Sequence, residues 1–166
     1  RALSRSRTFA LFVPIVIAMV ICDRLAKGWA VEHLRQGVAG PDFGLVDFTL
    51  VHNMGAAFGM GQGSGIIFIA IVLVITIAVI VWLAVGKHHD ALGVTGLALV
   101  VAGGIGNCID RLTTGYVVDF IRFTFIDFPV FNVADICVTC GVVLFLIALI
   151  RIEFAPGAHA KTKEKR

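Results

Sequence analysis

Charged residues are scarce in this chain of 166 residues: Asp, Glu, Lys and Arg make up 15% of it, 58% is hydrophobic, and the mean hydropathy is +0.96. Soluble domains carry about 25% charged residues. The composition therefore excludes an ordinary soluble domain and favours the lipid bilayer as the solvent. The basic tail at residues 155–166 predicts a cytoplasmic anchor at anionic membrane lipids and requires no nucleic acid as a partner.

The chain also lacks the patterns of common metal and cofactor sites. Cys137 and Cys140 have the spacing of a metal or redox pair, but no histidine lies near them, so we interpret the cysteines as small apolar residues at helix contacts. His88 and His89 fall in a short loop and are interpreted as solvated. The glycines of residues 59–65 are not followed by the Lys-Ser/Thr pair of a phosphate-binding loop. We therefore predict no metal and no cofactor.

Apolar runs long enough to cross a bilayer, which takes about 20 mostly apolar residues, recur along the chain. They cover about residues 9–30, 65–86, 91–110 and 130–151. The second run has no charge, whereas the others carry polar groups that must face protein or water. The uninterrupted apolar part of the first run ends at Cys22, as in a lipoprotein signal peptide, but Ile21 is not the small residue that a cleavage site requires. We expect it to be a retained helix.

Charge asymmetry predicts the topology. Lys and Arg gather on the side of the two termini, and most acids lie on the other side, which places both termini in the cytoplasm. Segments of about residues 36–64 and 111–130 are then extracytoplasmic. Within them, "LVDFTLVHN" and "YVVDFIRFTF" alternate as strands do and could pair, and residues 59–65 predict a flexible loop. The expected fold is a single all-α membrane domain with four transmembrane helices and a small β-strand platform.

Small residues in the third apolar run predict close helix packing. Gly103, Gly104 and Gly106 resemble a dinucleotide-binding pattern, but in a membrane helix small residues instead let a neighbouring helix approach. Asn107 and Asp110, which share one helix face, would then lie beside that neighbour.

Some acids have an obvious local partner. Lys27 stands one helical turn after Asp23, and Arg111 follows Asp110 directly. Both acids are therefore interpreted as structural. Asp127 precedes a loop and is interpreted as a solvated surface acid.

Asp119 and Asp135 have no such partner. Asp119 lies in an extended segment whose Arg122 points to the other face, and Asp135 begins an apolar helix one turn after Asn132. An acid in or near the membrane is a functional candidate, although Asp135 could instead cap its helix. Two adjacent carboxyl groups cannot easily both ionise, so they share a proton and supply a base and an acid together, as in an aspartic protease.

The ordered motifs "DRLAK", "NMGAAF", "GGIGNCIDR", "VVDF" and "FNVAD", between residues 23 and 135, resemble lipoprotein signal peptidase, a bacterial membrane aspartic protease also called signal peptidase II. The resemblance implies a multi-pass inner-membrane enzyme with its active site toward the outer face. We expect it to be a monomer. It would cut signal peptides from diacylglyceryl-modified prolipoproteins just before the lipidated cysteine. The strand platform and residues 59–65 would close over the substrate.

The resemblance also implies roles for particular residues. The catalytic pair would be Asp119 and Asp135. The substrate-binding residues would be Asn53, Asn107, Arg111 and Asn132. The structural support would come from Asp23, Lys27, Gly55, Gly104 and Asp110. Cys137, two residues after Asp135, is not part of the resemblance; it is an oddity of this chain that would make it sensitive to thiol reagents.

Other functions remain open from the residues alone. A proton-coupled transporter could line a path with the same acids, Lys27 and asparagines, but its polar groups would lie nearer the membrane centre and it would show internal repeats. A noncatalytic membrane assembly factor would tolerate neutralisation of the acids.

Overall fold

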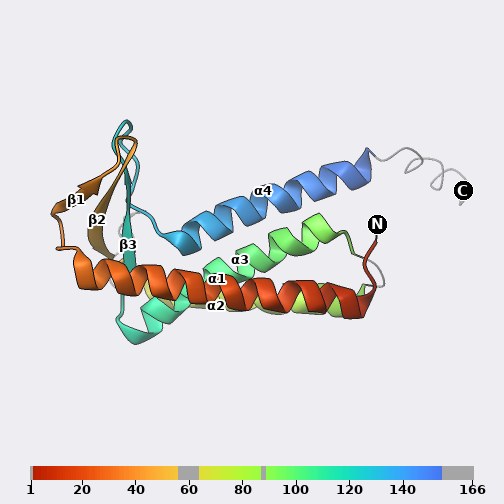
Figure 1. The fold of residues 1–166 in the computed structure, drawn as a ribbon. Coiled ribbons are helices and arrows are strands. Elements are labelled where there is room, and N and C mark those ends of the chain that lie inside the picture. Colours follow the sequence, from red (N-terminus) through yellow and green to blue (C-terminus); the bar gives the residue numbers. More distant parts are fainter. Residues whose placement is uncertain (1, 56–63, 87–88, 155–166) are drawn as a thin grey trace, which may run out of the picture.

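The computed structural model describes residues 2–55, 64–86 and 89–154. Its helices and strands follow in the order α1 (Arg5–His33), β1 (Ala39–Asp42), β2 (Val46–Asn53), α2 (Ser64–Val85), α3 (Ala91–Thr113), β3 (Val117–Phe123) and α4 (Val133–Glu153). The helices run along a common direction, and the strands lie at one end of the bundle (Figure 1). All four helices are long and apolar enough to span a membrane. The predicted fold of four spans and a small strand platform is confirmed.

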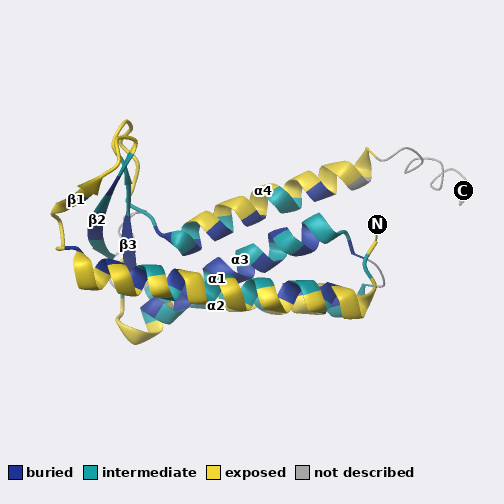
Figure 2. Cartoon of the chain, in the orientation of Figure 1, coloured by how far each residue is buried: buried dark blue, intermediate teal, exposed yellow. Residues whose placement is uncertain are grey.

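Helix α3 is the centre of the bundle. It is the most buried of the four spans (Figure 2). Helices α1, α2 and α4 expose large apolar side chains, as lipid-facing helices do. Glycines allow the close contact of α3 with α4: a Cβ at Gly96 would lie 2.6 Å from the Gly141 carbonyl oxygen, and one at Gly103 would collide with the Ala134 carbonyl oxygen. Gly104 instead contacts α2, where its Cβ would lie 2.9 Å from Val72. The predicted close packing at these glycines is confirmed.

The strands form one antiparallel sheet in the order β1-β2-β3. The two alternating segments predicted as strands pair directly, with Val51 opposite Asp119 and Asn53 opposite Val117. Phe131, which lies between β3 and α4 in the chain, forms an isolated bridge with Ile121. This bridge joins β3 to the start of α4. Sheet and span are thereby held together at the end of the bundle where the acids lie.

At the opposite end of the bundle, the prediction that His89 is solvated was wrong. His89 is not solvated: it is 3% exposed, its ring packs 4.4 Å from that of Trp82, and its backbone pairs with Leu3. His89 packs against the end of α2, where its imidazole Nε2 lies 3.2 Å from the Leu83 carbonyl oxygen. His88, most of the predicted loop at residues 59–65 and the basic tail at residues 155–166 lie outside the described residues.

The helices also extend beyond the predicted apolar runs. α1 begins at Arg5 and ends at His33, and α3 continues to Thr113, past the runs expected at residues 9–30 and 91–110. The added turns carry polar side chains, of which Glu32, His33 and Thr113 are exposed.

Candidate active site

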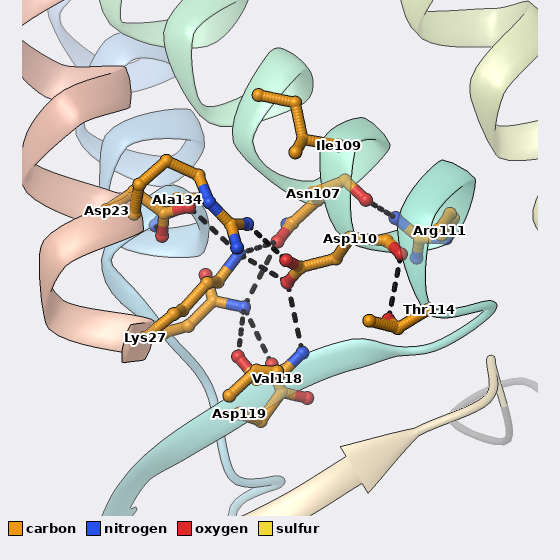
Figure 3. Close-up of polar contacts among 12 residues, drawn as sticks. Asp23, Lys27, Asn107, Ile109, Asp110, Arg111, Thr114, Val118, Asp119 and Ala134 are labelled. Carbon is orange, nitrogen blue, oxygen red and sulfur yellow. Dashed lines mark hydrogen bonds and ion pairs between the residues drawn. The ribbon is translucent and has the colours of Figure 1, made fainter. Parts of the chain in front are cut away.

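A buried ion cluster joins α1 to α3 beneath the sheet (Figure 3). The Lys27 ammonium, which has no exposed surface, lies 2.9 Å from a carboxylate oxygen of Asp23 and 2.9 Å from one of Asp110. Asp110 also accepts a hydrogen bond from the Arg24 guanidinium. Asp23 in turn accepts from the backbone N–H of Ala134 at 2.9 Å, which attaches the first turn of α4. The predicted Asp23–Lys27 pair is confirmed.

Asp110 was interpreted as structural because Arg111 is next to it, whereas the cations that contact it lie on α1. Successive residues of a helix point in different directions, so Asp110 faces Arg24 and Lys27. The Arg111 guanidinium instead lies 4.8 Å from the centre of the Phe68 ring on α2. The second oxygen of Asp110 accepts from the backbone N–H of Val118 at 3.1 Å, so this acid fixes the start of β3 and with it the next residue, Asp119.

Asp119 is held between two asparagines. It is 2% exposed, and its Oδ2 accepts from the Asn53 side-chain amide at 2.9 Å while its Oδ1 accepts from that of Asn132 at 2.6 Å. Burial raises the pKa of Asp119 to about 6, and the negative charge of Asp135 acts in the same direction, whereas the two amides oppose the rise. Asp119 therefore changes its protonation state near neutral pH.

Asp135 stands in the first turn of α4 and does cap that helix. Its Oδ2 accepts from the backbone N–H of Asn132 at 3.2 Å, and its own backbone N–H donates to Asn132 Oδ1 at 2.9 Å, the reciprocal arrangement of a capping box. Its other oxygen accepts from the Asn107 amide at 2.8 Å. Capping and a catalytic role are therefore not exclusive alternatives at Asp135.

Donor-only neighbours fix the orientation of all three asparagine side chains. Asn107 turns its oxygen to the Lys27 ammonium at 2.9 Å, and Asn53 turns its oxygen to the backbone N–H of Gly55 at 2.9 Å. Asn132 likewise uses its oxygen for the backbone N–H of Asp135. Because these neighbours can only donate, the amide NH₂ groups must point the other way, toward the two aspartates. The site is thus a set of aligned donors around two carboxyl groups.

A pocket of about 460 Å³ opens beside these two aspartates. Asn53, Gly55, Arg111, Asp119 and Asp135 supply its polar or backbone surface. Its apolar wall comprises Phe68, Phe123, Phe128, Pro129, Val130, Phe131, Ile136 and Cys140, and Thr139 also lines it. Gly55 adopts a φ of +91°, which favours glycine at this bend. Asn107 and Asn132 do not line the pocket, and their side-chain amides donate to Asp135 and Asp119, respectively.

Some residues of the site were not foreseen from the sequence. Arg24 follows Asp23 directly in the chain, yet it pairs with Asp110, 86 residues away. Cys140 lines the pocket, whereas the expected thiol, Cys137, is 3% exposed and buried against the protein. Helical spacing carries the signal for Cys140, because it lies on the same side of α4 as Ile136.

A sequence profile described as signal peptidase (SPase) II matches residues 15–151. The chain belongs to the signal peptidase II family. Two relatives are lipoprotein signal peptidases of Streptococcus pyogenes, from serotype M1 at 41% identity and from serotype M5 (strain Manfredo) at 40%. Each matches over 144 residues, 86% of this chain and 95% of the relative.

Solved structures show the same fold. A bacterial membrane enzyme determined by the in meso method at 2.3 Å resolution has a TM-score of 0.78 and 32% identity over 86% of this chain and 88% of that one. Another, at 1.9 Å resolution, has a TM-score of 0.77 and 33% identity over 84% and 92%. This signal peptidase II family member is therefore a bacterial transmembrane protease.

Proposed function

We propose that this chain is an aspartic endopeptidase that removes signal peptides from diacylglyceryl-modified prolipoproteins, cutting just before the lipidated cysteine. Asp119 and Asp135 are the catalytic pair in this proposal. The main support is that two carboxyl groups that form no ion pair within the described residues line one pocket, and each accepts a hydrogen bond from at least one asparagine side chain.

The chemistry needs one proton shared between the two carboxyl groups. The ionised carboxylate takes a proton from a water molecule as the water oxygen bonds to the scissile carbonyl carbon, and the protonated carboxyl group donates a hydrogen bond to the carbonyl oxygen. The base then passes its proton to the amide nitrogen as the C–N bond breaks. The products are a signal peptide carboxylate and a free amine on the lipidated cysteine. The raised pKa of Asp119 favours it as the protonated member.

The surroundings of the pocket suit a substrate that stays in the membrane. A cysteine with two acyl chains cannot leave the bilayer, so the protease must bring the catalytic groups to the membrane surface. The pocket begins at the sheet and continues along α4 past Ile136 and Cys140, which suits acyl chains beside the scissile bond. In this proposal Asn53 and Arg111 contact the substrate directly, while Asn107 and Asn132 orient the carboxyl groups.

The proposed orientation follows from the charges. Both termini lie in the cytoplasm, and the sheet, Asp119 and Asp135 lie at the outer face. Arg5 and Arg151, at the ends of α1 and α4 away from the sheet, support this orientation.

The substrate test uses one prolipoprotein in two forms, with and without the diacylglyceryl group, presented to the purified chain in liposomes. We expect cleavage of the modified form alone, and mass spectrometry should find the modified cysteine as the new N-terminus. Equal cleavage of the unmodified form, or a cut at another bond, would reject the proposed substrate. A proprotein whose lipid-acceptor cysteine is replaced by serine is the matched control.

A further inference from the structure

The free end of the sheet carries a patch of exposed apolar side chains. Its members are Phe43 and Leu45 in the turn between β1 and β2, and Phe125, Ile126 and Phe128 after β3, hereafter the apolar tip. They are 68%, 68%, 60%, 48% and 49% exposed, respectively. The two segments lie together, because the backbone N–H of Thr124 donates to the Leu45 carbonyl oxygen at 3.2 Å.

The apolar tip projects sideways from the bundle. The strands run across the direction of the helices, so the turn between β1 and β2 and the loop after β3 extend beyond the helix ends to one side (Figure 1). The same region is exposed (Figure 2). A sheet that lies across the end of four membrane spans lies along the membrane surface, and its free end therefore reaches over lipid rather than into bulk water.

The apolar tip is continuous with the lipid-facing part of the molecule. The Phe123 ring lies 5.4 Å from that of Phe125, 5.7 Å from that of Phe128 and 5.0 Å from that of Phe131. Phe123, Phe128 and Phe131 also line the pocket that continues along α4. One apolar surface thus runs from the tip to a transmembrane helix.

Polar groups limit how deep the tip could go. Asp42 and Asp127 flank its apolar members around a second hollow at the tip, together with the Arg122 guanidinium. Arg122 is hydrogen-bonded to Asp47, and these bonds hold the pKa of Asp47 below its ordinary value, so this pair stays charged. Aromatic rings next to charged groups are the composition found at the level of lipid headgroups.

We propose that the apolar tip inserts into the headgroup region of the outer leaflet and anchors the sheet over the catalytic pocket. Lipid is the partner because the tip adjoins the surface that already faces lipid and because large exposed aromatic side chains with a polar rim suit that interface. Anchoring would hold β3, which carries Asp119, against α4, which carries Asp135.

The test measures immersion and does not involve cleavage, so it stands apart from the proposed protease activity. Trp29 and Trp82 are replaced by Phe, and one tryptophan is introduced as Phe43→Trp, Phe125→Trp or, as the matched control, Val38→Trp. Val38 is 54% exposed but precedes β1, at the end of that strand away from the tip. Each variant is reconstituted in liposomes, and its fold is checked by circular dichroism.

The tryptophan fluorescence of the Phe43→Trp and Phe125→Trp variants should be quenched by lipids with brominated acyl chains and protected from aqueous iodide. The tryptophan fluorescence of the Val38→Trp variant should be quenched by iodide. Iodide quenching of the tip equal to that of Val38→Trp would overturn the proposal. Shielding from both quenchers would also overturn it, because a second copy of the chain or another protein would then cover the tip.

A second measurement avoids substitutions altogether. Photoactivatable lipids, with the reactive group near the headgroup, are cross-linked to the unmodified chain in liposomes, and the adducts are mapped by mass spectrometry. Adducts within residues 43–45 and 125–128 but not at residues 36–38 are expected. Absence of adducts at the tip, when α4 is labelled, would contradict the proposal.

Discussion

Asp119→Asn should alter how stability depends on pH. In the folded chain the pKa of Asp119 rises from 3.8 to about 6 because the side chain is buried. The folded state therefore binds this proton more tightly than the unfolded chain, and stability falls as pH rises between these two values. The loss is complete once the pH is well above 6 and the buried carboxyl group is fully ionised.

The magnitude follows from the shift. About two pKa units at about 1.4 kcal/mol each amount to about 3 kcal/mol, and for a chain of this size this corresponds to roughly 6–12 °C in melting temperature. Asparagine cannot ionise, so Asp119→Asn should lack this loss.

The assay is thermal unfolding of wild type and Asp119→Asn in one detergent between pH 4 and pH 7.5. Wild type should lose stability relative to the variant across that range. Asp47, whose pKa lies below its ordinary value, loses its stabilising effect only as pH falls, and it does so in both proteins. Parallel pH profiles of the two proteins would refute the reasoning, because Asp119 would then titrate as an ordinary surface carboxyl group.

Three further predictions concern single side chains. Asn53→Ala removes a hydrogen bond that favours ionised Asp119, so the pKa of Asp119 should rise. In a plot of cleavage rate against pH, the limb near pH 6 should therefore move to higher pH, and an unchanged limb would contradict the hydrogen bond between Asn53 and Asp119. Lys27→Met leaves two buried carboxylates without their shared cation and should destabilise the fold by about 3–5 kcal/mol, measured by unfolding in detergent; unchanged stability would contradict the buried cluster. An apolar maleimide should slow cleavage by wild type and Cys137→Ala but spare Cys140→Ala, and equal inhibition of all three would exclude Cys140.

The main elements of the fold could be predicted because the bilayer imposes simple rules. Apolar runs of sufficient length predicted all four helices, and alternation in "LVDFTLVHN" predicted β2. Helix ends were less predictable, because α3 continues beyond its apolar run, through Arg111 and on to Thr113. The burial of His89 depends on the return of the chain against Trp82, which no local pattern indicates.

The site was predictable only in part, because some of its contacts join residues that are far apart in the chain. Elimination of acids with local cations leaves Asp119 and Asp135, and the structure brings both to one pocket. The pairing of Arg24 with Asp110 joins residues far apart in the chain, so sequence spacing does not indicate it. The orientation of Asn107 depends on Lys27 in another helix and likewise needs the tertiary structure.

The most direct test of the central claim is cleavage of a diacylglyceryl-modified prolipoprotein in liposomes by wild type, Asp119→Asn, Asp135→Asn and Asp127→Asn. Asp127 is exposed and serves as the matched control, since it does not line the catalytic pocket. With all variants folded, the account predicts that Asp119→Asn and Asp135→Asn each lose roughly 10²–10⁴-fold in rate while Asp127→Asn cleaves like wild type. Wild-type cleavage by either Asp119→Asn or Asp135→Asn would contradict the assignment of that residue to the catalytic pair.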